Sequence, residues 1–170
     1  NNSSTSDYPP TASGTKGATW ALSHAPSIGF MAYLVTGRHY HLESLQFAAT
    51  YNYLAQVDNA TYSNRMGSQG VYMTNSGANT VRGAAWAIRT LAQAAVITPD
   101  GDTLQSEFLA SLASNVDFYH GKHVARASNP FGFVQPYSDA SGVGDNKWFE
   151  RSWMQDFFVA SVGYTKAMAP

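Results

Sequence analysis

The sequence contains no cysteine, which excludes a disulfide scaffold, a thiolate metal site and a cysteine nucleophile. It also lacks an excess of positive charge, because ten Lys and Arg stand against eleven Asp and Glu in 170 residues. Without that excess we expect neither nucleic acid nor a membrane surface as a partner. No apolar run reaches the roughly 18 residues that a membrane-spanning helix needs.

The motifs of several enzyme classes are missing as well. There is no Gly-rich phosphate loop and no Gly-x-Ser-x-Gly elbow, which argues against phosphoryl transfer and serine hydrolase chemistry. His39 and His41 are two residues apart, and His120 and His123 flank Gly121. Neither pair has a carboxylate at the spacing typical of a metal site. We therefore predict no metal and no other cofactor.

What the chain does contain is a moderate share of hydrophobic residues with little charge. The hydrophobic fraction is 44%, and only 12% of the residues are charged, about half the share usual in soluble domains. We expect one domain over residues 20–170 with a neutral, polar surface. Residues 1–19 consist mainly of Ser, Thr, Asn, Gly and Pro, so we expect a flexible or partner-bound arm there.

Five segments with helical periodicity predict an all-α fold. Turn residues separate the first two segments at Gly37, and the third and fourth at Gly101. Asp102 with Gln105 has the spacing of a capping box, as does Ser152 with Gln155. The expected helices cover residues 26–36, 38–56, 82–97, 102–120 and 153–168, with long loops over 58–80 and 121–151.

Apolar residues at helical spacing form the predicted core. In the first helix they are Ile28, Met31, Ala32, Leu34 and Val35, and in the second Leu42, Leu45, Phe47, Ala48, Tyr51 and Leu54. In the third they are Trp86, Ile88, Leu91, Ala92 and Ala95, and in the fourth Leu104, Phe108, Leu109, Leu112, Val116 and Tyr119.

The two tight turns indicate helical hairpins that repeat along the chain. Adding their spacing once more leads close to the end of the sequence, at the expected turn of a third hairpin. Hairpin arrays close their cores by stacking further copies. We therefore expect a partial α/α toroid that is a fragment, a processed piece or a protomer completed by neighbours. An ordinary five-helix bundle is the alternative.

Residues near the starts of the first, third and fifth helices form the candidate site. In a hairpin array these starts meet at the end of the long connections, where backbone N–H groups favour an oxygen-rich ligand. Aromatic rings stack on pyranose rings, while Arg and Asp bind hydroxyls in a directed way, so the composition is typical of a carbohydrate site. The candidates are His24, Arg82, Trp86, Arg89, Glu150, Arg151, Trp153 and Asp156.

Each candidate also has a purely structural interpretation: a helix cap, a loop contact, a core position or a local ion pair. Trp86 has the place of a core residue, and Glu150, Arg151 and Asp156 have the charges of an ion-pair network. Glu43 lies in the second helix, and we expect it to be a buried or interhelical partner and not a catalyst.

Four stretches of the sequence form longer motifs. They are His24-Ala-Pro-Ser27, Tyr40-His-Leu-Glu43-Ser-Leu-Gln-Phe47, the run from Val81 to Ala95, and Trp153-Met-Gln-Asp156-Phe-Phe. Together they resemble an uncharacterised bacterial and bacteriophage protein family over about residues 20–168. The resemblance implies a toroid of α/α hairpins, similar to the six-hairpin glycosidases and the toroidal polysaccharide lyases, with no established activity. It implies that the central funnel is faced by His24, Arg82, Arg89, Glu150 and Asp156.

These observations favour a carbohydrate-active domain, secreted or part of a virion, that binds or cleaves a polysaccharide. A glycoside hydrolase needs two carboxylates, for which Glu150 and Asp156 are the candidates. A lyase needs a proton acceptor, for which His24 or a loop Tyr is a candidate, with Arg82 and Arg151 neutralising a uronate. The low charge of the chain favours a neutral sugar.

The second interpretation is a non-catalytic structural or adhesion component of a bacteriophage virion or a surface assembly. The polar arm, the partial array and the aromatic-rich loop over 131–149 fit a chain that packs against copies of itself or against virion neighbours. The oligomeric state separates the two interpretations, because a monomer that cleaves a glycan supports the enzyme and a ring or filament without turnover supports the module.

Overall fold

The computed structural model describes residues 26–55, 81–125, 127, 130–132, 134 and 152–169. These residues form helices and no strand, which confirms the all-α prediction for the described part of the chain. The arm over 1–19 and most of both long loops lie outside it. The helices are α1 (Phe30–Thr36), α2 (His39–Ala55), α3 (Val81–Ile97), α4 (Thr103–Tyr119) and α5 (Ser152–Met168), and a π-helical turn (His120–Val124) continues α4.

Helix α1 is shorter than the sequence predicts, because it begins at Phe30 and not near Pro26. Gly29 precedes it in the left-handed conformation, with φ 96°. This conformation is open to glycine and strained for other residues, so the chain enters the helix only after Gly29. The helix ends where the sequence predicts, at Gly37, whose backbone N–H donates to the carbonyl oxygen of Tyr33 at 2.7 Å.

The predicted capping box of the fourth helix forms only in part. The Asp102 carboxylate accepts a hydrogen bond from the backbone N–H of Leu104 at 2.9 Å and caps α4. The Gln105 side chain does not complete the box, because its Nε2 donates to Asp100 Oδ1 at 3.0 Å. Asp102 therefore caps α4, and Gln105 forms a hydrogen bond to the turn that precedes the helix.

The predicted capping box of the fifth helix is replaced by a longer-range contact. Gln155 Nε2 donates to the carbonyl oxygen of Val134 at 2.6 Å, and Gln155 Oε1 accepts from the Val134 N–H at 3.0 Å. A single side-chain amide thus satisfies both backbone groups of Val134, as a neighbouring strand would. This pair holds the segment around Val134 against α5.

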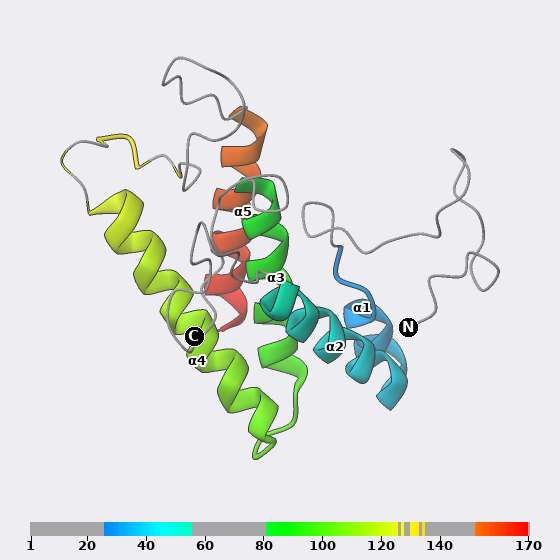
Figure 1. Ribbon diagram of the computed structural model, residues 1–170. Coiled ribbons are helices and arrows are strands. Elements are labelled where there is room, and N and C mark those ends of the chain that lie inside the picture. The colour runs from blue at the N-terminus through cyan, green and yellow to red at the C-terminus, as the bar shows by residue number, and fades with distance from the viewer. Residues whose placement is uncertain are drawn as a thin grey trace, which may run out of the picture.

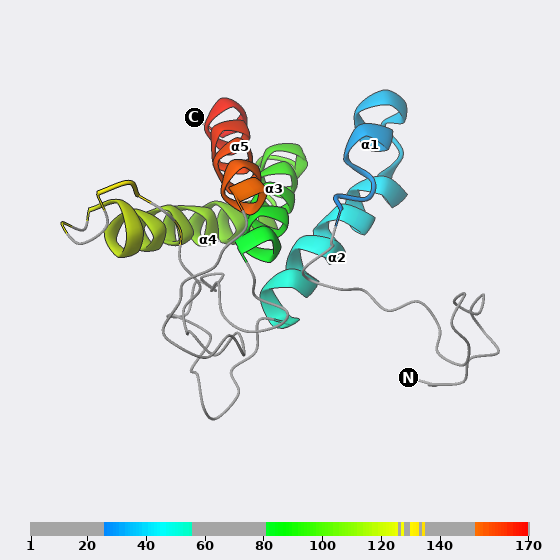
Figure 2. The same ribbon diagram turned by 90° about the horizontal axis from the view of Figure 1, so that it is seen from above.

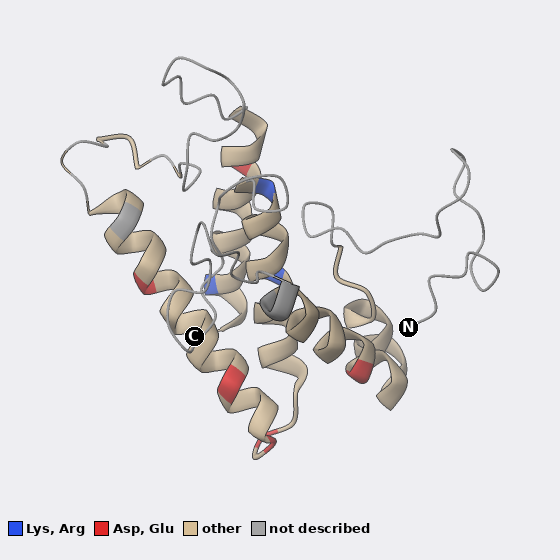
Figure 3. Ribbon diagram, viewed as in Figure 1, with Lys and Arg blue, Asp and Glu red and all other residues tan. Residues whose placement is uncertain are grey.

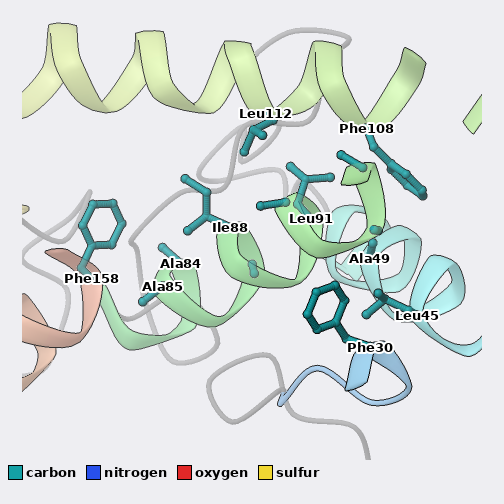
Figure 4. Packing of buried hydrophobic residues seen from close by; sticks show 14 of the residues in the cluster. Phe30, Leu45, Ala49, Ala84, Ala85, Ile88, Leu91, Phe108, Leu112 and Phe158 are labelled. Atoms are coloured by element: carbon teal, nitrogen blue, oxygen red, sulfur yellow. The ribbon is translucent and has the colours of Figure 1, made fainter. Parts of the chain in front are cut away.

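Helix α3 lies at the centre of the packing. It contacts α2, α4 and α5, and nearly all of its side chains are buried. Phe30, Leu45 and Ala49 pack on one side of it, while Phe108 and Leu112 pack on the other (Figure 4). Small side chains allow these neighbours to approach the α3 backbone closely. They are Gly83, Ala84, Ala85, Ala87, Ala92, Ala94 and Ala95.

Helices α3 and α5 lie side by side and begin at the same end of the molecule (Figures 1 and 2). Helix α4 runs back from the turn at Gly101, at the opposite end of α3. Helices α1 and α2 lie on the other side of α3 from α4 (Figure 2). The first turns of α3 and α5, which hold several candidate site residues, therefore point the same way.

The predicted apolar stripes are only partly buried. In α1 only Phe30 is buried, and Met31, Leu34 and Val35 are exposed, Val35 to 79%, as is Ile28 just before the helix. Phe47 on α2 is 72% exposed. A stripe is buried only where a neighbouring helix covers it, and the described helices cover one face of α1 and α2.

Helix α4 is turned relative to the predicted stripe. Leu109 and Val116, which the sequence places in the core, are exposed. Ser111 and Asn115 are buried in their place, beside Leu112. The face that meets α3 is therefore more polar than apolar periodicity alone indicates.

Candidate functional site

The structure describes five of the eight candidate residues. Arg82, Trp86 and Arg89 lie along the first half of α3, and Trp153 and Asp156 lie in the first turns of α5. Charged positions are sparse on the described helices (Figure 3). His24, Glu150 and Arg151 lie outside the described residues.

Trp86 and Arg89 are brought together with Phe157 of α5. The Arg89 guanidinium carbon lies 4.4 Å from the centre of the Trp86 ring and 5.9 Å from the centre of the Phe157 ring. The two rings meet edge to face, with centres 4.8 Å apart. Aromatic faces attract a cation electrostatically, so the pair of rings holds the guanidinium in place.

Burial in this cluster lowers the pKa of Arg89 from its ordinary value, because desolvation disfavours the charged form, while the nearby Tyr164 acts in the opposite direction. Arginine nevertheless stays protonated in proteins. Arg89 is therefore a fixed, partly desolvated cation.

Trp86 is half-buried, whereas the sequence places it in the core. The other members of that predicted set are confirmed as buried: Ile88, Leu91, Ala92 and Ala95. Trp86 lies at the edge of the α3 packing because its ring reaches toward Phe157 and Arg89 and does not fill the centre of the bundle.

A cavity of about 480 Å³ lies between the start of α1, the middle of α3 and the middle of α5. Arg89 and Gln93 enter it from α3, and Phe157, Ser161 and Tyr164 enter it from α5. Gln93 Nε2 donates to the Tyr164 hydroxyl oxygen at 3.0 Å. The remaining lining residues are Ser27, Gly29, Phe30, Met31, Ala32 and Ala160.

Three buried polar atoms of this lining have no hydrogen-bond partner among the described residues. They are Arg89 Nε, Gln93 Oε1 and Ser161 Oγ. The Gln93 side chain is 6% exposed and that of Ser161 is 2% exposed. Buried polar groups are almost always hydrogen-bonded, and each one left without a partner costs about 1–3 kcal/mol. All three atoms belong to residues that line the cavity, so its wall is polar as well as aromatic.

Gln93, Phe157, Ser161 and Tyr164 were not among the sequence-based candidates. A signal for them exists in the spacing, because Gln93 follows Arg89 by one helical turn and Ser161 follows Phe157 by one turn. A polar residue on an otherwise apolar helix face indicates a position of this kind. Nothing in the sequence indicates that the two helices bring these faces together.

The remaining candidates lie apart from the cavity. Asp156 and Trp153 have exposed side chains, Trp153 to 47%, and neither Arg82, Trp153 nor Asp156 belongs to the lining. The cavity lining contains no carboxylate among the described residues.

Glu43 is exposed, contrary to its expected buried place. Its carboxylate lies 3.5 Å from His39 Nδ1 on the surface of α2. Residues four apart on a helix meet in this way without any tertiary contact. Glu43 is therefore a local surface partner of His39.

Within the described ranges, no group of three or more His, Asp or Glu side chains is placed to hold a metal ion. Nor is any helix in those ranges long and apolar enough to cross a bilayer. Comparison with known proteins gives no matching family model, no matching curated protein and no matching solved structure.

Proposed function

We propose that this chain binds a saccharide in the cavity between α1, α3 and α5. The observation that carries the proposal is a cavity whose wall combines an Arg89 cation without a described counter-ion, the Phe157 ring, and the polar side chains of Gln93, Ser161 and Tyr164. The cavity volume of about 480 Å³ is within the range of small-molecule sites.

The chemistry of a sugar matches this lining. A sugar hydroxyl both donates and accepts, so it satisfies an acceptor such as Gln93 Oε1 and a donor such as Arg89 Nε–H. Phe157 offers an aromatic ring to the C–H face of a pyranose. A ligand gains affinity where its own hydroxyls take over hydrogen bonds that water would make at such a site.

The proposal extends to the arrangement of the helices. The parallel neighbours α3 and α5, with α4 on the outside, support a partial α/α toroid in which the first helix of each hairpin faces the ligand. Binding is better supported than cleavage, since no carboxylate is among the described residues of the cavity wall. A catalytic role for His24, Glu150 or Asp156 stays a prediction.

The test is a saccharide titration by calorimetry on the wild type and two serine variants. Ser161→Ala removes one hydrogen bond at the cavity, and we expect a Kd about fivefold higher. Ser106→Ala is the control, because Ser106 is an exposed residue of α4 whose hydroxyl donates to the Thr103 carbonyl oxygen. Equal affinities of the two variants contradict this site, and no binding to a broad panel of saccharides contradicts the function.

A second candidate function is the structural or adhesion module, which the exposed apolar residues of α1 and α2 favour. Their side chains leave a large apolar surface open to a neighbour, in a secreted or virion assembly or between copies of the chain. They are Ile28, Met31, Leu34, Val35, Tyr40 and Phe47.

Sedimentation equilibrium tests this second function. The module is expected to self-associate, and the paired change Val35→Ser and Phe47→Ser is expected to shift it to the monomer. A wild type that stays monomeric at high concentration contradicts self-assembly through this surface.

A further inference from the structure

Arg89 holds a positive charge that no described carboxylate neutralises. It forms no ion pair with any residue that the structure describes, and Tyr164 is the one group that counteracts the lowering of its pKa. Trp86 and Phe157 cover the guanidinium with aromatic rings, which attract a cation but accept no strong hydrogen bond. Arg89 lines the cavity, and its guanidinium is therefore left without an anionic partner among the described residues.

The wall combines one cationic donor, Arg89, with hydroxyl and amide side chains that each carry both a donor and an acceptor. Gln93 Nε2 already donates to the Tyr164 oxygen, so the Tyr164 O–H proton is directed elsewhere, and it has no acceptor among the described residues. Ser161 and Arg89 bring two further donors without an acceptor. Gln93 Oε1 and the Ser161 hydroxyl oxygen are free acceptors on the same wall, so it is the positive charge of Arg89 that favours an anionic ligand.

We infer that the saccharide is acidic, and that its carboxylate pairs with Arg89 and accepts hydrogen bonds from the hydroxyls of Tyr164 and Ser161. This inference rests on the proposed saccharide function and names the class of sugar. An ionised carboxylate neutralises the guanidinium and matches its geometry, and it can accept from the hydroxyl groups beside it. A neighbouring ring hydroxyl then donates to Gln93 Oε1.

The net charge of the chain favours a neutral sugar, and the local arrangement leads to the opposite conclusion. A net charge of −1 is spread over the whole molecule and is screened by salt beyond about 10 Å. The Arg89 charge is partly desolvated and acts at contact distance, where an ion pair is screened much less. The residue that touches the ligand therefore decides the preference.

The experiment compares trigalacturonate with its methyl ester on the full chain, by calorimetry at constant ionic strength. The ester keeps the sugar and removes the charge. We expect the acid to bind at least about tenfold more tightly, as charge-assisted hydrogen bonds are stronger than neutral ones. In Arg89→Gln the preference should vanish, whereas Arg38→Gln, an exposed residue before α2, should keep it.

The other outcomes separate the inference from the function on which it rests. Equal affinity for acid and ester overturns the inference and leaves the saccharide site standing. N-acetylglutamate binding as tightly as trigalacturonate shows recognition of any carboxylate, and overturns the saccharide function. No binding of either sugar overturns both. The comparison of acid and ester on the wild type tests the inference even if the Arg89→Gln variant does not fold.

Discussion

At the scale of single residues, buried hydroxyls of the described part of the chain differ in whether they are hydrogen-bonded. Thr98 is fully engaged, because its hydroxyl donates to the Ala94 carbonyl oxygen at 2.7 Å and accepts from Gln46 Nε2 at 3.1 Å. Thr165 is equally buried, and its hydroxyl has no partner among the described residues. Burial alone therefore does not tell which hydroxyl stabilises the fold.

This contrast gives a matched pair of substitutions. Thr98→Val is expected to lower the free energy of unfolding by about 1–2 kcal/mol, because the amide of Gln46 loses its acceptor. Thr165→Val keeps the shape and removes an unpaired hydroxyl, so we expect a change within about 0.5 kcal/mol or a gain. Urea denaturation measures both, and equal losses contradict the assignment.

Trp86 gives a second prediction at this scale. Trp86→Ala removes a half-buried ring from Phe157 and Arg89, and we expect a loss of about 2 kcal/mol, below the 3–5 kcal/mol of a fully buried aromatic residue. Trp153→Ala, at an exposed position of α5, is the control and should cost less than about 0.5 kcal/mol. Thermal denaturation followed by circular dichroism measures both. A loss above 4 kcal/mol would make Trp86 a core residue.

At the scale of elements, nearby residues determine where a helix begins and ends. They do not determine which of its faces is buried. Glycine positions and one aspartate cap fix where α1 ends and α4 begins. Which side of α4 meets α3 depends on the partner, and the structure buries Asn115 there while it exposes Leu109.

Two glycines separate these effects experimentally. A side chain at Gly29 would overlap the backbone of His41, and its φ of 96° is strained for other residues, so Gly29→Ala is expected to cost at least about 2 kcal/mol. Gly163 lies inside α5 with open space around it, so Gly163→Ala is expected to add about 0.5–1 kcal/mol. Guanidinium denaturation compares them, and a similar effect of both would refute the close approach at Gly29.

At the scale of the whole molecule, α3 lies at the centre of the packing, and α1 has the fewest buried residues of the described α-helices. α3 is buried on nearly every side, whereas α1 has seven residues and only Phe30 is buried among them. Isolated helices of that length are not stable in water. The start of α1 nevertheless lines the cavity, so we expect a ligand bound there to stabilise α1.

Hydrogen exchange tests that coupling. The α1 amides should exchange faster than those of α3 in the free protein, because local opening exposes few buried contacts. Saturating trigalacturonate should slow exchange in α1 and leave α4 unchanged, because no α4 residue lines the cavity. Protection that is absent from α1, or that is equal in α4, contradicts the placement of the ligand.

The sequence by itself determined the helices and most of their limits. Periodicity, the Gly37 stop and the Asp102 cap are local, because each depends on backbone geometry within a few residues. It also pointed to Trp86 and Arg89, since aromatic and guanidinium groups one turn apart share a helix face.

Only the tertiary structure decided which faces are buried and where a cavity lies. Ile28, Met31 and Val35 have core periodicity but no described neighbour covers them. Gln93 and Ser161 are distant in sequence and line one cavity only because α3 and α5 run side by side. A side chain's burial and its missing hydrogen bond depend on what a distant segment brings to it, and periodicity along one helix holds no information about that segment.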